Sequence, residues 1–209
     1  MTALTIAFAA GKGGVGKTTC TALVAQAAAH AGRRVLAVDA DSQGSLLSWS
    51  GDADGLGAVS VVALPTARLD RELPAVAAAY DVAVIDCPPG VGDQRITEAA
   101  LRAATLAVVP MAHTLADLDR LRWTLDLAHT QGAPAVVLLN KMRTGTRSAR
   151  DVLEALEQLD DVPVLQTTVP LAERVAGAFG TRALPDPFPA LWAELADVMA
   201  ALTKGRRRG

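Results

Sequence analysis

The sequence predicts an α/β fold in which helices cover both faces of a mostly parallel, twisted sheet. Short apolar runs of strand length alternate along the chain with longer runs of helical pattern. The 209 residues are 51% hydrophobic and only 3% aromatic, a composition that suits parallel strands buried on both faces. A glycine-rich segment between the first strand and the first helix is the third observation, because phosphate-binding α/β folds place such a loop there.

Apolar runs between turn residues predict the strands. They cover residues 3–10, 35–38, 59–64, 82–85, 105–109, 135–139 and 162–167. Pro65 and Pro110 follow two of these runs, and we expect each proline to end its strand because it lacks a backbone N–H.

Ala-rich or amphipathic runs predict the helices between the strands. They cover residues 17–31, 45–50, 66–79, 96–104, 115–130, 147–159 and 189–202. Gly32 lies where a glycine commonly closes a helix, and we expect Pro74 to break the third helix. Apolar residues recur at helical spacing in the last helix, as expected of a helix packed on the core.

The length fits one domain, which we expect to span residues 1–203, followed by a basic tail at 204–209. The net charge is −2, but four basic residues crowd the tail, namely Lys204, Arg206, Arg207 and Arg208. Without these four, the remaining 16 basic and 22 acidic residues carry a net charge of −6, so the tail is a local feature. We find no apolar run near the ~18 residues of a membrane span and no export signal, and expect a cytoplasmic protein.

The glycine-rich segment satisfies the pattern G-x-x-x-x-G-K-[ST] in full. Its residues are Gly11, Lys12, Gly13, Gly14, Val15, Gly16, Lys17 and Thr18, with Thr19 following. Glycines let backbone N–H groups turn inward around phosphate oxygens, and the next helix directs its positive end at them. We expect Lys17 to bind the β- and γ-phosphates and the Thr18 hydroxyl to reach Mg²⁺. The segment therefore predicts a P-loop that binds a nucleoside triphosphate.

Lys12 is a second lysine that the general pattern does not require. The segment K-G-G-V-G-K-T-T at residues 12–19 resembles the deviant Walker A box of the ParA/MinD family of ATPases. The resemblance implies that Lys12 reaches across a dimer interface to the partner subunit's nucleotide, so that ATP joins two subunits in a sandwich. The alternative is a solvated surface charge.

Two carboxylates, Asp39 and Asp41, follow the second strand, at the edge where doubly wound sheets bind ligands. The segment Asp39–Gly44 resembles the family's switch I, D-x-D-P-Q-G, in which the second Asp is assigned to water activation. Asp41 is therefore the candidate general base or water-orienting residue, and Asp39 the candidate support for the Mg²⁺ shell. Ser42 departs from the usual proline, which loosens the backbone at this point. The alternative is a solvated acidic loop.

Asp86 ends the fourth apolar run in the manner of a Walker B aspartate, which steadies Mg²⁺ through its water shell. We expect Thr18, Asp41 and Asp86 to form the Mg²⁺ site. The following D-x-P-P-G resembles the family's switch II, which implies that the Gly90 N–H points toward the γ-phosphate. Cys87 lies where the family commonly has threonine or another small residue.

The resemblance extends to the base-binding side, where it implies that Asn140 reads the adenine edge and that the loop at Pro170 closes over adenine. A turn-forming asparagine is the alternative for Asn140. Trp49 follows switch I as in the small partition ATPases, but a plain core anchor is equally compatible. His113 has no Cys or His partners at ligand spacing, and we expect a polar loop residue there.

The motifs match from residue 12 to about residue 180 and are most similar to the small ParA-like ATPases without an N-terminal DNA-binding domain. The resemblance implies a Mg²⁺-ATP-dependent homodimer on the nucleoid that drives plasmid or chromosome partition. Its implied partners are DNA, bound without sequence preference, and a ParB-like or small centromere-binding protein that stimulates hydrolysis. The candidate DNA-binding residues are Lys141, Arg143, Arg147, Arg150, Arg206, Arg207 and Arg208.

Three other functions use similar motifs. Positioning of another cargo is one, and sequence alone does not separate it from partition. A MinD-like membrane ATPase is the second, but it needs a terminal helix with cations on its polar face, where this chain has Glu194 and Asp197. A metabolic member is the third; an iron–sulfur reductase needs cluster cysteines, and Cys20 and Cys87 do not match those positions.

Overall fold

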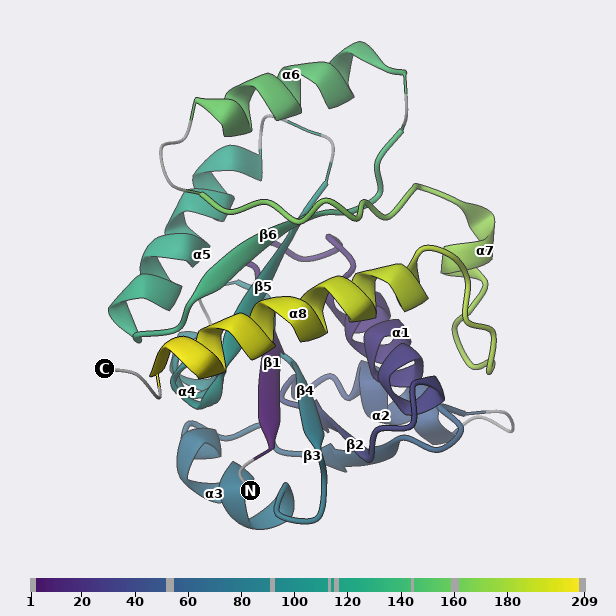
Figure 1. Cartoon of the computed structure of the whole chain (residues 1–209), viewed down its shortest axis with the longest axis vertical. Helices are drawn as coiled ribbons and strands as arrows, with labels where there is room; N and C mark the ends of the chain where they lie inside the picture. The colour runs from purple at the N-terminus through teal and green to yellow at the C-terminus, as the bar shows by residue number, and fades with distance from the viewer. Residues whose placement is uncertain are drawn as a thin grey trace.

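Six parallel strands form a single sheet in the computed structural model, in the order β3-β2-β4-β1-β5-β6 (Figure 1). The structure describes residues 3–51, 55–90, 93–112, 114, 117–143, 145–158 and 162–206. The strands are β1 (Leu4–Phe8), β2 (Val35–Asp39), β3 (Ser60–Ala63), β4 (Val82–Asp86), β5 (Leu106–Met111) and β6 (Ala135–Leu139). The predicted α/β fold with a parallel sheet is confirmed, and the last predicted strand is the exception treated below.

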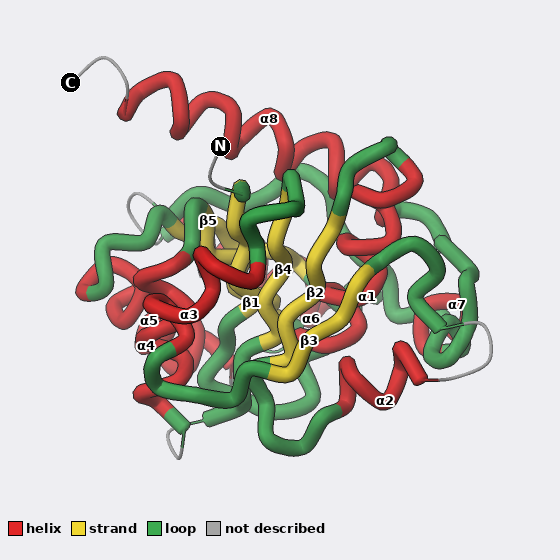
Figure 2. The backbone as a smooth tube through the Cα atoms, turned by 90° about the horizontal axis from the view of Figure 1, so that it is seen from below, coloured by secondary structure: helices red, strands yellow, loops and turns green. Residues whose placement is uncertain are grey.

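Helices cover both faces of this sheet (Figure 2). The described helices are α1 (Lys17–His30), α2 (Ser45–Gly51), α3 (Leu69–Val76), α4 (Gln94–Ala103), α5 (Leu118–Thr130), α6 (Arg147–Glu157), α7 (Glu173–Ala176) and α8 (Phe188–Arg206). On one face α1 and α8 bury the larger apolar cluster, while α3, α4 and α5 enclose the other (Figure 2). A third cluster joins the β5–β6 end to α5 and α6. No described helix is long and apolar enough to cross a membrane.

The strand register brings two acidic residues together at one edge of the sheet. Asp39 at the end of β2 is paired in register with Asp86 at the end of β4, and Phe8 of β1 is paired with Asp86 on its other side. Because all strands are parallel, the segments that leave these strands start from the same edge. The chain after β1 is the glycine-rich loop, so that loop and both acidic residues meet there.

Two prolines lie inside elements that we expected them to interrupt. Pro74 is within α3, which ends two residues later at Val76, so that little helix follows the proline. Pro110 is within β5, where the next residue, Met111, accepts a hydrogen bond from Asn140 on the β6 side. Alternation then directs the missing N–H of Pro110 toward β1, whose pairing with β5 already ends at Phe8 and Val108.

The predicted strand at residues 162–167 is not a strand of the sheet. This segment is extended beside β6, but only an isolated bridge joins Val164 to Val137. The backbone N–H groups of Gln166 and Thr167 donate instead to the carboxylate of Glu194 on α8, at 2.6 and 2.9 Å. Because the Leu165 N–H donates to Val137 of β6, the Thr167 N–H is the next donor that a continuous ladder would use, and Glu194 takes it.

Candidate nucleotide-binding site

The glycine-rich loop connects the end of β1 to the start of α1. Gly14 and Gly16 have φ angles of 76° and 90°, which an L side chain rarely adopts. Gly16 is the N-terminal cap of α1, and within the described part of the chain no side-chain hydrogen bond caps that helix. The first N–H groups of α1 therefore remain available to an anion, as a phosphate-binding loop requires.

A short hydrogen bond joins the helix after the loop to the end of β4. The Thr18 hydroxyl donates to Oδ2 of Asp86 at 2.6 Å. The other oxygen of Asp86 is buried and has no hydrogen-bond partner among the described residues. Burial raises the pKa of Asp86 to about 7, against the lowering effect of the Thr18 hydrogen bond. A buried carboxylate oxygen without a partner next to a hydroxyl suits a bound cation.

The Thr18 hydroxyl and the Asp86 carboxylate fit Mg²⁺ better than they fit a metal whose ligands all come from the protein. Among the described residues no cluster of three or more His, Cys, Asp or Glu side chains could hold a metal ion by itself. Mg²⁺ commonly binds through one or two protein oxygens, phosphate oxygens and several waters. Thr18 and Asp86 supply such a pair. Thr18 also lines a cavity beside the loop, and Asp41 lines that cavity too.

Lys17 also lines this cavity, whose volume is about 270 Å³. The cavity is lined by Gly13, Gly14, Gly16, Lys17, Thr18, Thr19, Asp41, Pro89 and Lys141. Lys17 is 7% exposed, and its ammonium group donates to the backbone carbonyl of Lys12 at 3.4 Å. Burial lowers the pKa of Lys17, while the negative charge of Asp86 opposes that shift. A buried cation beside open backbone N–H groups is the arrangement that binds the phosphates of a nucleotide.

The two switch I aspartates have different environments. Asp39 is fully buried, and its two oxygens accept hydrogen bonds from the N–H groups of Asp41 at 3.1 Å and Leu47 at 2.8 Å. Burial raises the pKa of Asp39, although these hydrogen bonds oppose the rise. Asp41 is partly exposed; one oxygen accepts a hydrogen bond from the Gln43 N–H at 2.9 Å. Asp39 thus holds the switch I backbone, and Asp41 is the carboxylate at the cavity.

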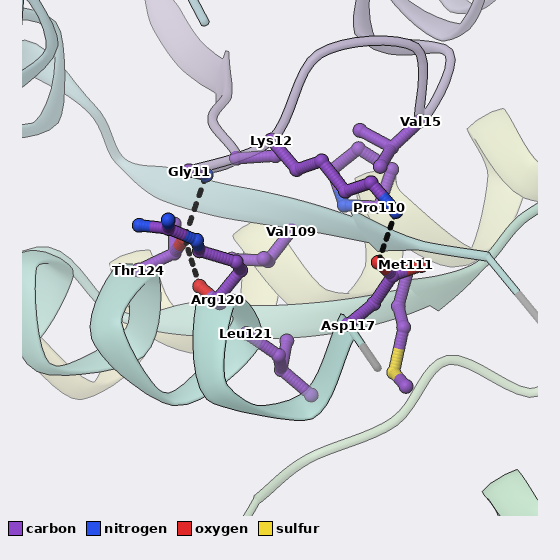
Figure 3. A pocket seen from close by; sticks show the side chains of 11 residues that line it. Gly11, Lys12, Val15, Val109, Pro110, Met111, Asp117, Arg120, Leu121 and Thr124 are labelled. Carbon is purple, nitrogen blue, oxygen red and sulfur yellow. Dashed lines mark hydrogen bonds and ion pairs between the residues drawn. The ribbon is translucent and has the colours of Figure 1, made fainter. Parts of the chain in front are cut away.

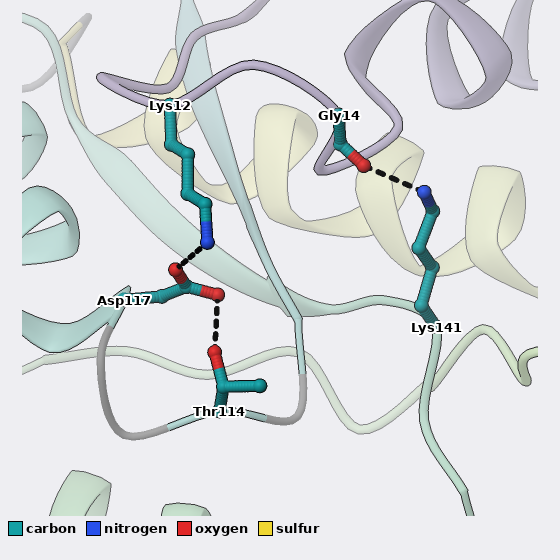
Figure 4. A network of polar contacts seen from close by, with 5 residues as sticks. All are labelled: Lys12, Gly14, Thr114, Asp117 and Lys141. Carbon is teal, nitrogen blue, oxygen red and sulfur yellow. Dashed lines mark hydrogen bonds and ion pairs between the residues drawn. The ribbon is translucent and has the colours of Figure 1, made fainter.

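Lys12 does not contact the cavity that its own loop encloses. Its ammonium nitrogen is 2.6 Å from Oδ1 of Asp117, and the other oxygen of Asp117 accepts a hydrogen bond from the Thr114 hydroxyl at 2.7 Å (Figure 4). On the same side, the Gly11 N–H donates to the hydroxyl of Thr124 on α5 at 3.0 Å (Figure 3). One flank of the loop is therefore attached to α5.

The turn after β6 holds the other flank of the loop. The side-chain amide of Asn140 donates to the carbonyl of Val15 at 2.7 Å, and its oxygen accepts the N–H of Lys141. The ammonium group of Lys141 donates to the carbonyl of Gly14 at 2.6 Å (Figure 4). We expected Asn140 to read adenine and Lys141 to bind DNA. Both side chains contact the glycine-rich loop in this structure, and no described contact tests either role.

The remaining predicted base-side and switch residues surround this turn. Pro170 lies beside it, because the Met142 N–H donates to the carbonyl of Val169 and the Leu171 N–H donates to that of Met142. Gly90 follows the cavity-lining Pro89 and has a φ angle of 75°. No described contact tests an adenine or γ-phosphate role for either residue.

Trp49 is a core residue in this structure. It is 1% exposed, and its ring centroid is 4.9 Å from that of Phe179. This burial favours the interpretation of Trp49 as a plain core anchor.

Of the predicted DNA-binding residues, Lys141 lines the cavity, and none of the others that the structure describes is part of its lining. Arg143, Arg147 and Arg150 are exposed on the turn after β6 and on α6. We expected the basic tail to follow the last helix, but α8 continues to Arg206. Arg207 and Arg208, like His113, lie outside the described residues.

Sequence reasoning did not identify Asp117 or Thr124 as part of the site. Both come from α5 and its N-terminal cap, more than a hundred residues after the loop that they contact. No local motif marks them. The sequence shows Asn140 and Lys141 directly after a buried strand. Their contacts with the glycine-rich loop depend on the tertiary fold, so the sequence does not reveal them.

Comparison with known proteins agrees with this geometry. A family model described as the CobQ/CobB/MinD/ParA nucleotide binding domain matches residues 6–183. The sporulation initiation inhibitor protein Soj of Bacillus subtilis is 30% identical, over 83% of this chain and 86% of its own length. The maintenance of carboxysome distribution protein A of Gloeobacter kilaueensis is 36% identical, over 74% of this chain and 69% of its own. The septum site-determining protein MinD of Pyrococcus horikoshii, solved with Mg-ADP, has the same fold, with a TM-score of 0.71 and 22% identity over 96% of this chain and 97% of its own.

Proposed function

The chain belongs to the CobQ/CobB/MinD/ParA family of nucleotide-binding domains, and from this membership and its site we propose that it is a Mg²⁺-dependent ATPase that partitions plasmid or chromosomal DNA. In this proposal ATP joins two copies of the chain in a sandwich dimer. The ATP-bound dimer binds DNA without sequence preference on the nucleoid, in the cytoplasm. A ParB-like or centromere-binding protein stimulates hydrolysis and releases the dimer.

The observation that carries the proposal is one phosphate-binding loop with two lysines in different positions. Lys17 is buried at the cavity and is available to the phosphates of its own subunit's nucleotide. Lys12 is turned outward to Asp117 and is half exposed. A nucleotide bound to one subunit needs only Lys17 from the loop of that subunit. Lys12 is therefore suited to a nucleotide bound by another copy of the chain.

In this proposal different residues of the chain have different roles in ATP hydrolysis. The loop N–H groups and the Lys17 ammonium group bind the phosphates, and Asp41 orients the attacking water. Thr18 and Asp86 would hold Mg²⁺, which would supply positive charge beside the phosphate oxygens. None of the described residues that line the cavity is an arginine, so hydrolysis by the chain alone should be slow. An arginine supplied by a partner protein can raise such a rate on the order of 10³–10⁵-fold.

Positioning of a cargo other than DNA is the second candidate. The 36% identity to a maintenance of carboxysome distribution protein supports it. The same ATP-dependent dimer on DNA would then move a protein assembly. The two functions differ in the partner protein, which would be a DNA-binding adaptor for partition and a protein bound to the assembly for cargo positioning.

A membrane-associated function is less compatible with α8. An interfacial helix needs a free apolar face. The buried apolar residues of α8 instead pack in the core, and they are Phe188, Leu191, Trp192, Leu195 and Met199.

The proposal is tested by light scattering and phosphate release with purified protein. We expect a dimer with ATP and Mg²⁺, a monomer with ADP, and slow hydrolysis that EDTA abolishes. The dimer should bind duplexes of unrelated sequence. A protein that remains monomeric with ATP and releases no phosphate would contradict the proposal.

A further inference from the structure

Two adjacent side chains bind two adjacent carbonyls of the phosphate-binding loop. Lys141 donates to the carbonyl of Gly14 (Figure 4). Asn140 donates to the carbonyl of Val15. The fit at Asn140 is close, because a Cβ added to Gly16 would overlap its amide nitrogen. The glycine at this position is thus required both by its positive φ and by Asn140.

Peptide geometry gives these two hydrogen bonds a consequence inside the loop. In a planar trans peptide the carbonyl of one residue and the N–H of the next point in opposite directions. A Gly14 carbonyl held toward Lys141 therefore turns the Val15 N–H away from Lys141. In the same way, the hydrogen bond from Asn140 turns the Gly16 N–H away from Asn140. Two successive donors are thereby oriented before any anion binds.

The backbone at Lys141 is unfavourable for a lysine. Its φ angle is 56°, and it is the one residue other than glycine with a positive φ in the part of the chain that the structure describes. Non-glycine residues in this conformation are uncommon and concentrate at functional sites. Glycine or asparagine would suit the turn better, so the turn alone does not explain the lysine.

We propose that Lys141 is a positioning residue of the nucleotide site, which clamps the loop so that its N–H groups face the nucleotide phosphates. The inference rests on the proposed nucleotide-binding function and adds a residue outside the loop motif to it. The clamp acts on the loop backbone, so it should help ADP and ATP to the same degree. A direct contact between Lys141 and the γ-phosphate would instead favour ATP.

The test compares the affinity of purified variants for Mg-ATP and Mg-ADP by equilibrium fluorescence, together with thermal unfolding without nucleotide. Lys141→Gly removes the ammonium group and relieves the positive φ, so it should unfold at the wild-type temperature or above it. Lys141→Met keeps most of the side-chain stem and removes the charge. Lys141→Arg keeps a cationic donor. Arg68→Ala is the charge-matched control, since Arg68 is exposed and its ion pair with Glu72 is outside the cavity.

We expect Lys141→Gly and Lys141→Met to lose on the order of tenfold in affinity for both nucleotides, the typical contribution of a hydrogen bond from a charged donor. Lys141→Arg should retain most of the affinity, and Arg68→Ala all of it. Affinities of Lys141→Gly within twofold of wild type would overturn the clamp, as would a loss confined to ATP. Failure of the wild-type protein to bind either nucleotide would instead reject the proposed function itself.

Discussion

In the single chain the ammonium nitrogen of Lys12 lies 2.6 Å from Oδ1 of Asp117, at the N-terminus of α5. The Asp117 side chain is 5% exposed, whereas that of Lys12 is 51% exposed. Lys12 is therefore held by its own subunit in this structure. In the dimer that we propose, Lys12 would leave this ion pair to reach the partner subunit's nucleotide, and contacts formed in the dimer would have to offset its loss. Under that proposal the ion pair favours the monomer until ATP is bound.

Lys17→Ala should abolish nucleotide binding. The buried ammonium group is the cation at the cavity, and its removal should lower ATP affinity on the order of 100-fold or more. The fold should remain intact, because a buried lysine is costly to desolvate and alanine is not. Equilibrium binding and thermal unfolding check the two statements. Near wild-type affinity would show that the phosphates bind elsewhere.

Lys12→Ala should bind ATP normally but fail to form the ATP-dependent dimer. The reason is that Lys12 contacts α5 and is not among the residues that line its own cavity. Light scattering with ATP at several protein concentrations measures the effect, and Lys17→Ala serves as the variant that loses binding itself. Normal dimerisation of Lys12→Ala would reject a role across the interface.

Asp41→Ala should bind ATP and dimerise yet hydrolyse it ~10²–10⁴-fold more slowly, the usual effect of removing a general base. The carboxylate lines the cavity and is partly exposed to the water it would orient. A substitution of Asp39 is the comparison variant. The oxygens of Asp39 hold the switch I backbone, so its loss should impair folding of that loop rather than hydrolysis alone. Wild-type turnover of Asp41→Ala would transfer the role to another group.

The parallel sheet and the phosphate-binding loop were predictable because their signals are local. Buried strands appear as apolar runs, and the loop motif requires its glycines at fixed positions. The loop's supports were not predictable, since Asp117 and Thr124 contact it only through the tertiary fold. The failure at residues 162–167 has the same cause, because Glu194 on a distant helix accepts the Thr167 N–H, which a continuous ladder would direct toward β6.

Glu194 should make stability depend on pH. Burial acts to raise the pKa of Glu194, but hydrogen bonds from the Thr167 hydroxyl and from two backbone N–H groups outweigh it and leave that pKa lowered. A carboxyl whose pKa is lower in the folded state stabilises the protein above its unfolded pKa of about 4.3. That contribution disappears as the pH falls through the folded pKa.

Glu194→Gln should therefore lower the free energy of unfolding at pH 7 by about 1 kcal/mol, and the difference from wild type should shrink toward pH 3. Urea unfolding at pH 7, 5 and 3.5 without nucleotide measures it. Asp197→Asn is the control, as Asp197 is an exposed acid on the same helix. An equal difference at every pH would mean that the ionised carboxylate is not what stabilises the segment.

DNA binding by the dimer should depend on the exposed arginines of the turn after β6 and of α6. These are Arg143, Arg147 and Arg150, since the ammonium group of Lys141 binds the loop. The chain has a net charge of −2, so affinity for DNA must come from such local clusters. Dimerisation by ATP brings two copies of the cluster onto one particle and converts a weak contact into a multivalent one.

If about four phosphates are neutralised per dimer, the logarithm of the affinity should fall against the logarithm of salt with a slope near roughly −3.6. The affinity should not depend on DNA sequence, because flexible cationic side chains contact phosphates rather than bases. Binding of unrelated duplexes with ATP and with ADP, at several salt concentrations, measures both quantities. Replacing the three arginines by glutamine should weaken binding and flatten the slope, whereas Arg68→Gln with Arg71→Gln on and beside α3 should change neither. Removal of residues 204–209 tests the tail separately, and binding that survives loss of both clusters would place the DNA surface elsewhere.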